Sequence, residues 1–282
     1  MNDDAVALLR CPHCAADLES DDTALVCDRG HTFDIARQGY VSLLAGSGGK
    51  IVGDSADMVA ARDDFLARGH YDPIMDAVAA DLGGARRILD VGVGTGHYLA
   101  RALGAADPEV VGIGVDVSKA AARRAARAHP RAAAVVADVW NSVPVKTGSV
   151  DAVLSVFSPR NAEELHRVLA PTGRLIVVTP TEHHLAPLVE ELDLLRVDQS
   201  KTRRLGDTLA GRFDRVHRSA LTYEILLTHD EVAAVVGMGP SARHISAADL
   251  RERIDAGPSP RRVTVAVTVG VYERVADSTA AE

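Results

Sequence analysis

Residues 87–99 read Arg87-Ile-Leu-Asp90-Val-Gly92-Val-Gly94-Thr-Gly96-His-Tyr-Leu99. The apolar run before the glycines predicts a buried strand, and the residues after them place Leu99 and Leu103 on one face of a helix. A strand, a glycine-rich turn and a helix open a nucleotide-binding βαβ unit. Glycine allows the sharp turn and lets a ligand approach the backbone. The stretch therefore predicts an α/β domain with a parallel sheet and a nucleoside site.

The details of this turn indicate which ligand it binds. A dinucleotide loop carries a third glycine three residues after the second, but that position is His97 here. Asp90 stands just before the first glycine, where its carboxylate would repel a pyrophosphate and attract a cation. The pattern D-x-G-x-G-x-G, with Gly92, Gly94 and Gly96, resembles the first motif of class I S-adenosylmethionine-dependent methyltransferases. The alternative is an ordinary glycine-rich turn without a ligand.

Size and composition limit the remaining possibilities. The 282 residues can hold one large α/β domain and a small module. No apolar run approaches the roughly 20 residues that a membrane span requires, and the acidic N-terminus lacks the features of a signal peptide. We therefore expect a cytoplasmic protein with no membrane partner. The net charge of −8 argues mildly against a general nucleic-acid coat protein, although a local basic patch remains compatible with it.

The three cysteines belong to a second informative pattern. Cys11, Cys14, Cys27 and His31 have the spacing C-x2-C-x12-C-x3-H. Two tight turns that present two ligands each can build a closed tetrahedral zinc site, and thiolate with imidazole selects zinc over harder ions. About 40 residues bury too little surface to fold alone, so the metal would supply folding energy. His13 is a rival ligand, but it lies inside the first turn, which favours His31; free thiols are the alternative to a metal site.

The segments on either side of the nucleotide strand complete the predicted domain. Two helices are expected before it, from 54 to 69 and from 70 to 84, where they could cover a cofactor; Tyr71 would be a lid residue or a packing aromatic. Asp116 ends the next strand, 26 residues after Asp90, where an acid can accept both ribose hydroxyls. Asp138 ends the third strand, where methyltransferases commonly hold the adenine amino group, although it could be a loop aspartate.

The second half of the chain carries weaker signals. The fourth strand, 150–156, ends at Phe157, which could stack on a planar base at the carboxyl edge of the sheet or be a core aromatic. A turn at 171–173 and a strand at 174–178 follow, and Thr179 to Leu185 is predicted to start a helix. A histidine at the start of this helix could touch the cofactor or lie at the surface, and spacing alone favours the surface. Strands near 220–227 and 262–272, with a helix at 230–236 between them, would complete the sheet. Residues 196–218 hold seven basic and three acidic side chains, which favours either a phosphate-contact surface or a solvated helix face.

Taken together, these patterns resemble the zinc-containing 23S rRNA (guanine-N1)-methyltransferases, and most of all the actinobacterial branch that confers tylosin and mycinamicin resistance. The resemblance covers nearly the whole chain. It depends on Cys11-Pro-His-Cys14, Cys27, the run His31 to Val41, Gly69-His-Tyr71, Asp90 to Gly96, Asp116-Val-Ser-Lys119, Phe157-Ser-Pro-Arg-Asn161 and Thr179-Pro180 with His184.

The resemblance implies a fold, a reaction and several site residues. The fold would be a class I methyltransferase doubly wound sheet preceded by a zinc-ribbon-like module. Tyr71, Gly94, Thr95 and His184 would contact S-adenosylmethionine, and the zinc module would help recognise an rRNA hairpin. Family members form dimers whose cleft receives RNA, and methylation of a loop guanine near the peptide exit tunnel weakens macrolide binding. No residue identifies itself as a general base.

Two rival functions and a division into domains follow from the same patterns. One rival is a small-molecule methyltransferase of a biosynthetic pathway, and the other is a non-enzymatic RNA-binding module. The zinc module argues against the first, and the glycine-rich turn against the second. The expected division is a zinc-binding RNA-recognition module at 1–45, a linker and cofactor-covering helices at 46–84, a methyltransferase domain at 85–275 and a disordered tail at 276–282.

Overall fold

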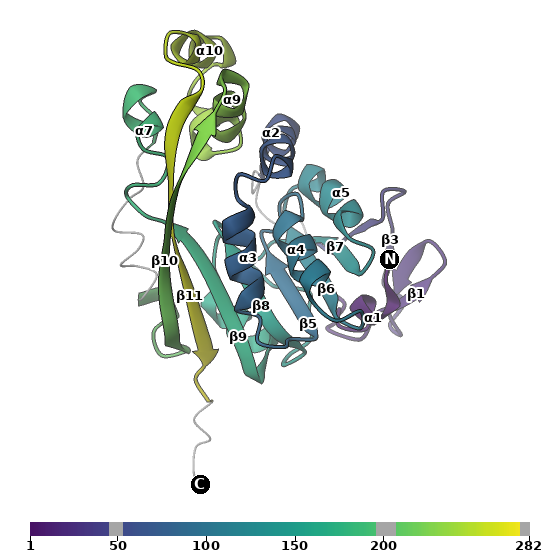
Figure 1. Cartoon of the computed structure of the whole chain (residues 1–282). Coiled ribbons are helices and arrows are strands. Elements are labelled where there is room, and N and C mark those ends of the chain that lie inside the picture. Colours follow the sequence, from purple (N-terminus) through teal and green to yellow (C-terminus); the bar gives the residue numbers. More distant parts are fainter. Residues whose placement is uncertain (45–52, 196–206, 277–282) are drawn as a thin grey trace.

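A computed structural model describes residues 1–44, 53–195 and 207–276 (Figure 1). Within these residues, eight strands form one mixed sheet in the order β10-β11-β9-β8-β5-β6-β7-β4, and β1-β2-β3 form a small antiparallel sheet. The N-terminal elements are α1 (Asp3–Val6), β1 (Glu19–Asp21), β2 (Ala24–Val26), β3 (Thr32–Asp34), β4 (Tyr40–Ser42), α2 (Ala56–Ala67) and α3 (Asp72–Ala80). The central elements are β5 (Arg87–Val91), α4 (His97–Ala105), β6 (Val111–Asp116), α5 (Lys119–Ala128), β7 (Ala132–Val136), β8 (Val150–Val156), α6 (Ala162–Val168) and β9 (Leu169–Pro180). The C-terminal elements are α7 (Leu188–Glu191), β10 (Phe213–Leu227), α9 (His229–Gly237), η1 (Pro240–Arg243), α10 (Ala247–Asp255) and β11 (Arg261–Arg274).

The strand order places the glycine-rich turn where ligands bind in this kind of sheet. Strands β4, β7, β6, β5, β8 and β9 run parallel, whereas β11 pairs antiparallel with β9 and β10 antiparallel with β11. From β5 the chain moves outward to β6 and β7 on one side, then returns to β8 and β9 on the other. The turn after β5 therefore lies at the topological switch point, outside the carboxyl ends of the strands. This confirms the predicted doubly wound α/β fold.

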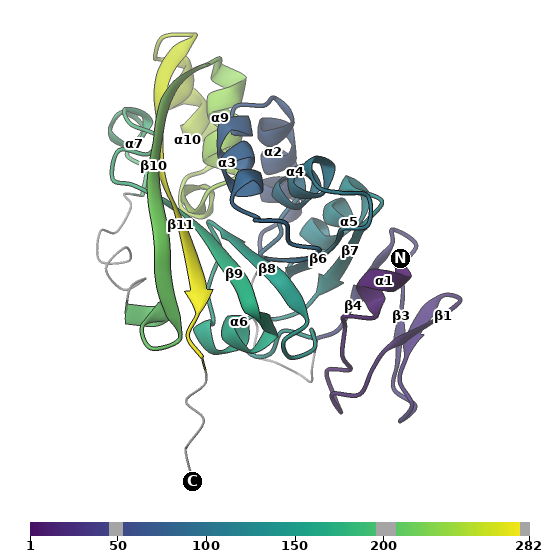
Figure 2. The same cartoon turned by 60° about the horizontal axis from the view of Figure 1, so that its bottom comes forward.

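The two faces of the sheet are covered by different parts of the chain. In β5, Ile88 belongs to the hydrophobic cluster shared with α3, α4, α9 and α10, whereas Leu89 and Val91 belong to the cluster on the opposite face. That opposite face is covered by α6 together with apolar residues of the N-terminal module, among them Leu9 and Leu25 (Figure 2). The N-terminal module therefore contributes to the core of the large sheet instead of standing apart from it.

Several elements differ from the sequence-based expectations. The strand expected at 40–44 pairs parallel with β7 and forms an edge of the large sheet. The expected turn at 171–173 lies inside β9, and β10 begins at Phe213, well before residue 220. The helix expected to start at Thr179 is absent: residues up to Pro187 form turns, and only α7 is helical. Leu185 has a φ of +63°, outside the right-handed helical region, and Ala186 precedes Pro187, where the helical conformation is disfavoured, so the helix starts only after these residues.

The basic segment 196–218 was predicted as a phosphate-contact surface or a solvated helix face. From Phe213 onward its residues belong to strand β10, so this part is not a helix face. Arg215 and Arg218 are exposed on strand β10, and Arg212 lies just before it. Arg196, Asp198, Lys201, Arg203 and Arg204 lie outside the described residues. Within the described residues, no helix has the length and apolar character that a membrane span requires.

Candidate functional site

The glycine-rich turn has a backbone that only glycine can adopt here. The φ angles are +72° at Gly92, +55° at Gly94 and +86° at Gly96. A Cβ on Gly92 would lie 2.5 Å from the Cβ of Ser158, and a Cβ on Gly96 would lie 2.8 Å from the Cβ of Ala128. Side chains are therefore excluded at both positions by backbone angle and by space. The contact with Ser158 also places the turn against the loop that follows β8.

Asp116, at the carboxyl end of β6, holds this turn. Its carboxylate accepts hydrogen bonds from the backbone N–H of Gly94 at 3.0 Å and of Ser118 at 2.8 Å. Burial raises the pKa of Asp116, while these two N–H groups favour its charged form. A carboxylate has about four lone-pair directions, so two remain for a ligand such as a ribose diol. Asp116 therefore keeps acceptors for a ligand, and its role toward the ribose stays a prediction.

A buried carboxylate and a buried hydroxyl lie below the turn. Asp90 is 2% exposed, and burial, together with the charge of Asp116, raises its pKa well above the ordinary value. The hydroxyl of Tyr98 on α4 has no hydrogen-bond partner among the described residues, and the charge of Asp90 acts on it. Buried polar groups are nearly always paired, so the unpaired hydroxyl of Tyr98 indicates that a polar ligand completes its hydrogen bonding. An ammonium group, which carries three donors, fits these acceptors.

Helix α2 covers the same turn. The Arg62 side chain would lie 3.5 Å from a Cβ on Gly94. Its guanidinium forms an ion pair with Asp54 at 2.7 Å and donates to the backbone carbonyl of Met238 at 2.8 Å. The first of the two expected helices therefore packs over the predicted cofactor turn.

The second helix brings an aromatic cluster to the carboxyl edge. Tyr71, at the start of α3, lies with its hydroxyl 3.1 Å from Nε2 of His184, and both rings lie about 6 Å from the ring of Phe157. The Nδ1 atom of His184 accepts the backbone N–H of Ala266 at 3.2 Å. Burial lowers the pKa of His184 to about 4, so its imidazole is neutral near pH 7. His184 is buried, so the surface position that spacing favoured for it is wrong; packing against Tyr71 and Phe157 brings the three residues into one group.

Within this group, Phe157 differs from a packing residue. It is 40% exposed, and its φ of +51° lies in the left-handed region, which costs a non-glycine residue about 1–2 kcal/mol. Strain of this kind is concentrated at functional sites. The exposed ring excludes the alternative of a core aromatic, and a role of Phe157 in substrate contact stays a prediction.

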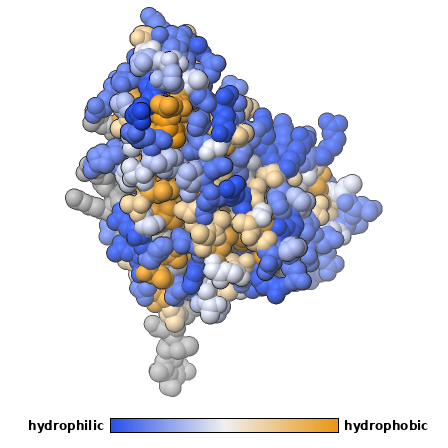
Figure 3. Space-filling model, in the orientation of Figure 1, coloured by the Kyte–Doolittle hydropathy of each residue, from blue (hydrophilic) through white to orange (hydrophobic). Residues whose placement is uncertain are grey.

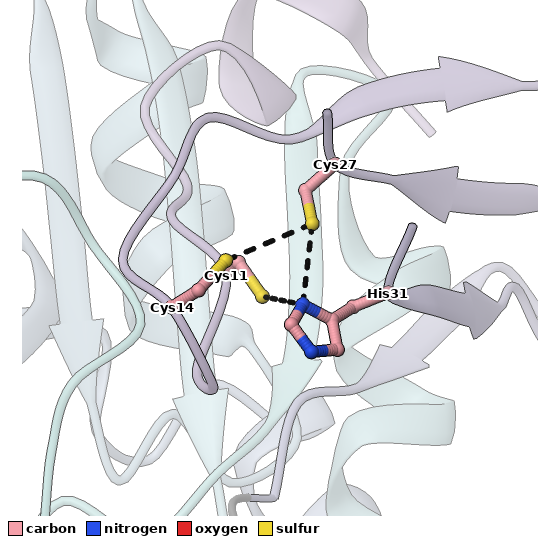
Figure 4. A group of neighbouring side chains, drawn as sticks. All are labelled: Cys11, Cys14, Cys27 and His31. Carbon is pink, nitrogen blue, oxygen red and sulfur yellow. Dashed lines mark hydrogen bonds between the residues drawn. The ribbon is translucent and has the colours of Figure 1, made fainter. Parts of the chain in front are cut away.

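The four predicted zinc ligands converge at one point (Figure 4). The Nδ1 atom of His31 lies 3.5 Å from Sγ of Cys11 and 3.4 Å from Sγ of Cys27, and the Sγ atoms of Cys14 and Cys27 are 3.8 Å apart. A tetrahedral zinc with Zn–S of about 2.3 Å and Zn–N of about 2.0–2.1 Å has S···S edges of about 3.8 Å and S···N edges of about 3.5 Å. The donor set and its spacing therefore fit one tetrahedral zinc.

The surroundings of the cluster support the choice of ligands. All four ligand atoms lie within 4.8 Å of one another, whereas His13 is exposed and stacks on Phe33 at 5.7 Å. Burial opposes thiolate formation, but hydrogen bonds from the backbone amides of His31 and Arg29 lower the pKa of Cys27 to about 7. A thiolate, the form that binds metal, is therefore accessible near neutral pH.

Comparisons with known proteins agree with both sites. Residues 9–46 match the family model described as RlmA, N-terminal, a zinc ribbon, and residues 88–173 match a methyltransferase domain. The chain is 47% identical to the 23S rRNA (guanine(748)-N(1))-methyltransferase of Streptomyces fradiae, over 96% of this chain and 98% of that protein. It is 46% identical to a protein of Micromonospora griseorubida provisionally named a 23S rRNA (guanine-N(1)-)-methyltransferase, over 98% and 100% of the two chains.

This chain belongs to the 23S rRNA (guanine-N1)-methyltransferase family. Solved structures with lower identity share only its fold. The [4+2]-cyclase SpnF is similar with a TM-score of 0.54 and 15% identity, over 79% of this chain and 94% of that one. A chain from the complex of the Haloferax volcanii Trm112 methyltransferase activator with a methyltransferase has a TM-score of 0.51 and 18% identity, over 80% and 98%.

Most of the cofactor-site residues predicted from the sequence lie together in the structure. Asp90, the glycine turn and Asp116 form one group, and Thr95 is buried beside it with its hydroxyl 2.8 Å from His97. Asp138 is half-buried at the end of β7, and its carboxylate accepts the backbone N–H of Trp140 at 2.9 Å, so a role toward adenine stays a prediction.

Sequence reasoning missed two residues in this part of the molecule. Arg62 and Tyr98 stand in ordinary helical patterns, and nothing in the sequence distinguishes them from other helix residues. The helical position of Tyr98, directly after the turn, was the one available signal. Their importance becomes visible only through what they contact.

Proposed function

We propose that this protein transfers the methyl group of S-adenosylmethionine to N1 of a guanine in a hairpin loop of 23S rRNA. The observation that carries the proposal is 47% identity, over nearly the full length of both chains, to a protein named for this reaction. A zinc cluster and a glycine-rich methyl-donor site within one chain support it. A small-molecule methyltransferase would have no evident use for the zinc module.

The residues around the glycine turn are suited to hold the cofactor. In our proposal, Asp116 accepts the ribose hydroxyls, and the turn of Gly92, Gly94, Thr95 and Gly96 passes close to the ligand. Asp90 attracts its cationic end, and Asp138 contacts the adenine. Tyr71 and His184 line the side that faces Phe157. When bound, S-adenosylmethionine supplies an activated methyl group on a sulfonium.

Phe157 is suited to hold the acceptor base. A loop guanine is unpaired and can be extruded, and aromatic rings recognise such bases by stacking. Alignment of guanine N1 with the methyl group would supply much of the rate enhancement. His184 is not placed as a general base, because Nδ1 already accepts an N–H and Nε2 faces Tyr71. The protein therefore acts mainly by positioning, and no side chain is assigned to remove the N1 proton.

The zinc is structural in this proposal. Cys11, Cys14, Cys27 and His31 would hold it, and the metal would stabilise a module that covers one face of the sheet and contacts the rRNA hairpin. We retain the division into a module at 1–45, covering segments at 46–84, a methyltransferase domain at 85–275 and a tail at 276–282.

We also propose that the protein is a cytoplasmic homodimer that confers resistance to tylosin-type macrolides. Strand β10 supports dimerisation, because it is an edge strand of 15 residues that exposes Val216 and Leu226. Apolar patches over β10 are visible on the surface in Figure 3. Sedimentation equilibrium tests the dimer: a monomer mass at micromolar concentration would contradict it.

One experiment tests the reaction. The protein and labelled S-adenosylmethionine are incubated with unmodified large-subunit rRNA, and the product is mapped by primer extension. A strong stop at one loop guanine is expected, because N1 methylation blocks base pairing. Label incorporated at no rRNA position would contradict the proposal and favour a small-molecule substrate. Growth of a macrolide-sensitive host expressing the protein, with and without tylosin, tests the resistance role separately.

A further inference from the structure

The single tryptophan of this chain is strongly exposed. Trp140 is 57% exposed, the largest fraction among the large hydrophobic residues of the described chain. It belongs to neither hydrophobic cluster and stacks on no other ring of the described residues. A tryptophan is usually mostly buried, and leaving it in water forgoes a large hydrophobic stabilisation. An isolated exposed apolar residue is common on protein surfaces, so its setting decides whether it has a role.

The backbone of Trp140 is fixed although its side chain is not packed. Its N–H donates to the carboxylate of Asp138 at 2.9 Å, and its carbonyl accepts the side-chain N–H of Asn161 at 3.0 Å. Asn161 also caps α6, where its side-chain oxygen accepts the N–H of Glu164. The indole is therefore presented to solvent from a rigid frame, which reduces the entropy lost when a ligand stacks on it.

The same loop connects the zinc module with the acceptor site. Arg10, one residue before the first zinc ligand, donates to the hydroxyl of Ser142 at 3.2 Å, and Leu9 forms a β-bridge with Val145. At its other side the loop is bonded to Asn161, which lies four residues after Phe157. The loop that carries Trp140 is therefore bonded on one side to the segment before the first zinc ligand and on the other to the loop that follows Phe157.

We propose that Trp140 is a stacking platform for an unpaired base of the RNA hairpin loop, between the zinc module and the methyl-transfer site. This inference rests on the proposed function and adds a residue that determines RNA affinity. Aromatic side chains are suited to this role, because every base has a π-face, and removal of one stacking ring typically weakens single-strand binding by about 5- to 150-fold.

The test uses the indole as its own probe, since the chain has one tryptophan. Full-length protein is titrated with three ligands: a synthetic 23S rRNA hairpin, a fully paired RNA duplex of the same stem, and S-adenosylhomocysteine. The hairpin loop carries guanine 748, the base in the name of the Streptomyces fradiae relative. Quenching of tryptophan emission by the hairpin, but not by the duplex or by S-adenosylhomocysteine, is expected. Equal quenching by S-adenosylhomocysteine would overturn the proposal, because the ring would then stack on the cofactor.

Affinities of variants complete the test. Trp140→Ala should bind a labelled hairpin about 5- to 150-fold more weakly, Trp140→Phe should retain most of the affinity, and both should bind S-adenosylhomocysteine like the wild type. Leu195→Ala, which removes another exposed apolar side chain, is the matched control and should leave hairpin affinity unchanged. Hairpin affinity within about twofold of wild type for Trp140→Ala would overturn the stacking role. Methyl transfer by the wild type to rRNA, measured in parallel, tests the proposed function independently.

Discussion

Removal of the Asp116 carboxylate should weaken cofactor binding strongly. The carboxylate already accepts two backbone N–H groups, at 3.0 and 2.8 Å, and two further lone-pair directions remain for the ribose. A hydrogen bond to a charged group contributes about 1.5–3 kcal/mol. Loss of two ribose bonds in Asp116→Ala therefore corresponds to about 3 kcal/mol at the lower limit, a fall in affinity of roughly 100-fold.

Isothermal titration calorimetry with S-adenosylhomocysteine measures this effect. Asp116→Asn keeps the size of the side chain and one acceptor oxygen, so its affinity should lie between those of the wild type and Asp116→Ala. Asp249→Ala, which removes an exposed carboxylate on α10, is the control for a general change in charge. Melting curves establish that each variant is folded. If folded Asp116→Ala binds S-adenosylhomocysteine as tightly as the wild type, Asp116 is not part of the site.

Three further predictions concern the turn, the histidine and the metal. Gly92→Ala should lower the free energy of unfolding by about 2–5 kcal/mol, because the new side chain adds left-handed strain and overpacking against Ser158. In urea titrations, the additional substitution Ser158→Gly should recover part of this loss. Wild-type stability of Gly92→Ala would contradict the predicted clash. His184 has a folded pKa of about 4, below its unfolded value of about 6.5, so only the unfolded state binds its proton between these values. Stability should therefore fall as pH drops from about 6.5 to 4, by up to about 3 kcal/mol, and His184→Gln should flatten this slope; an unchanged slope excludes His184 as its source. Zinc chelation or Cys27→Ser should disorder β1–β3 in hydrogen exchange and weaken RNA binding while S-adenosylhomocysteine still binds; undiminished RNA affinity would count against a recognition role for the module.

Local patterns in the sequence were sufficient for the elements that depend on local chemistry. The alternate glycines after β5 have positive φ angles, as a turn of this kind requires, and the spacing of Cys11, Cys14, Cys27 and His31 brings four donors together. Apolar runs located the parallel strands of the sheet. Each of these features depends on residues that are close in the sequence, so short-range patterns of backbone preference and ligand spacing predict it.

Contacts between distant segments followed from the tertiary structure alone. Tyr71 and His184 are 113 positions apart, and their contact exists because α3 and the turn after β9 pack at one edge of the sheet. Three other features also join segments that are distant in the sequence. They are the position of β4 in the large sheet, the packing of the zinc module on the second face of that sheet, and the hydrogen bond between Asn161 and Trp140. No short-range pattern encodes them, because they result from the burial of whole apolar faces against each other. The sequence thus determined the chemistry of the methyl-donor turn and the metal cluster, and the packed fold decided which side chains surround them.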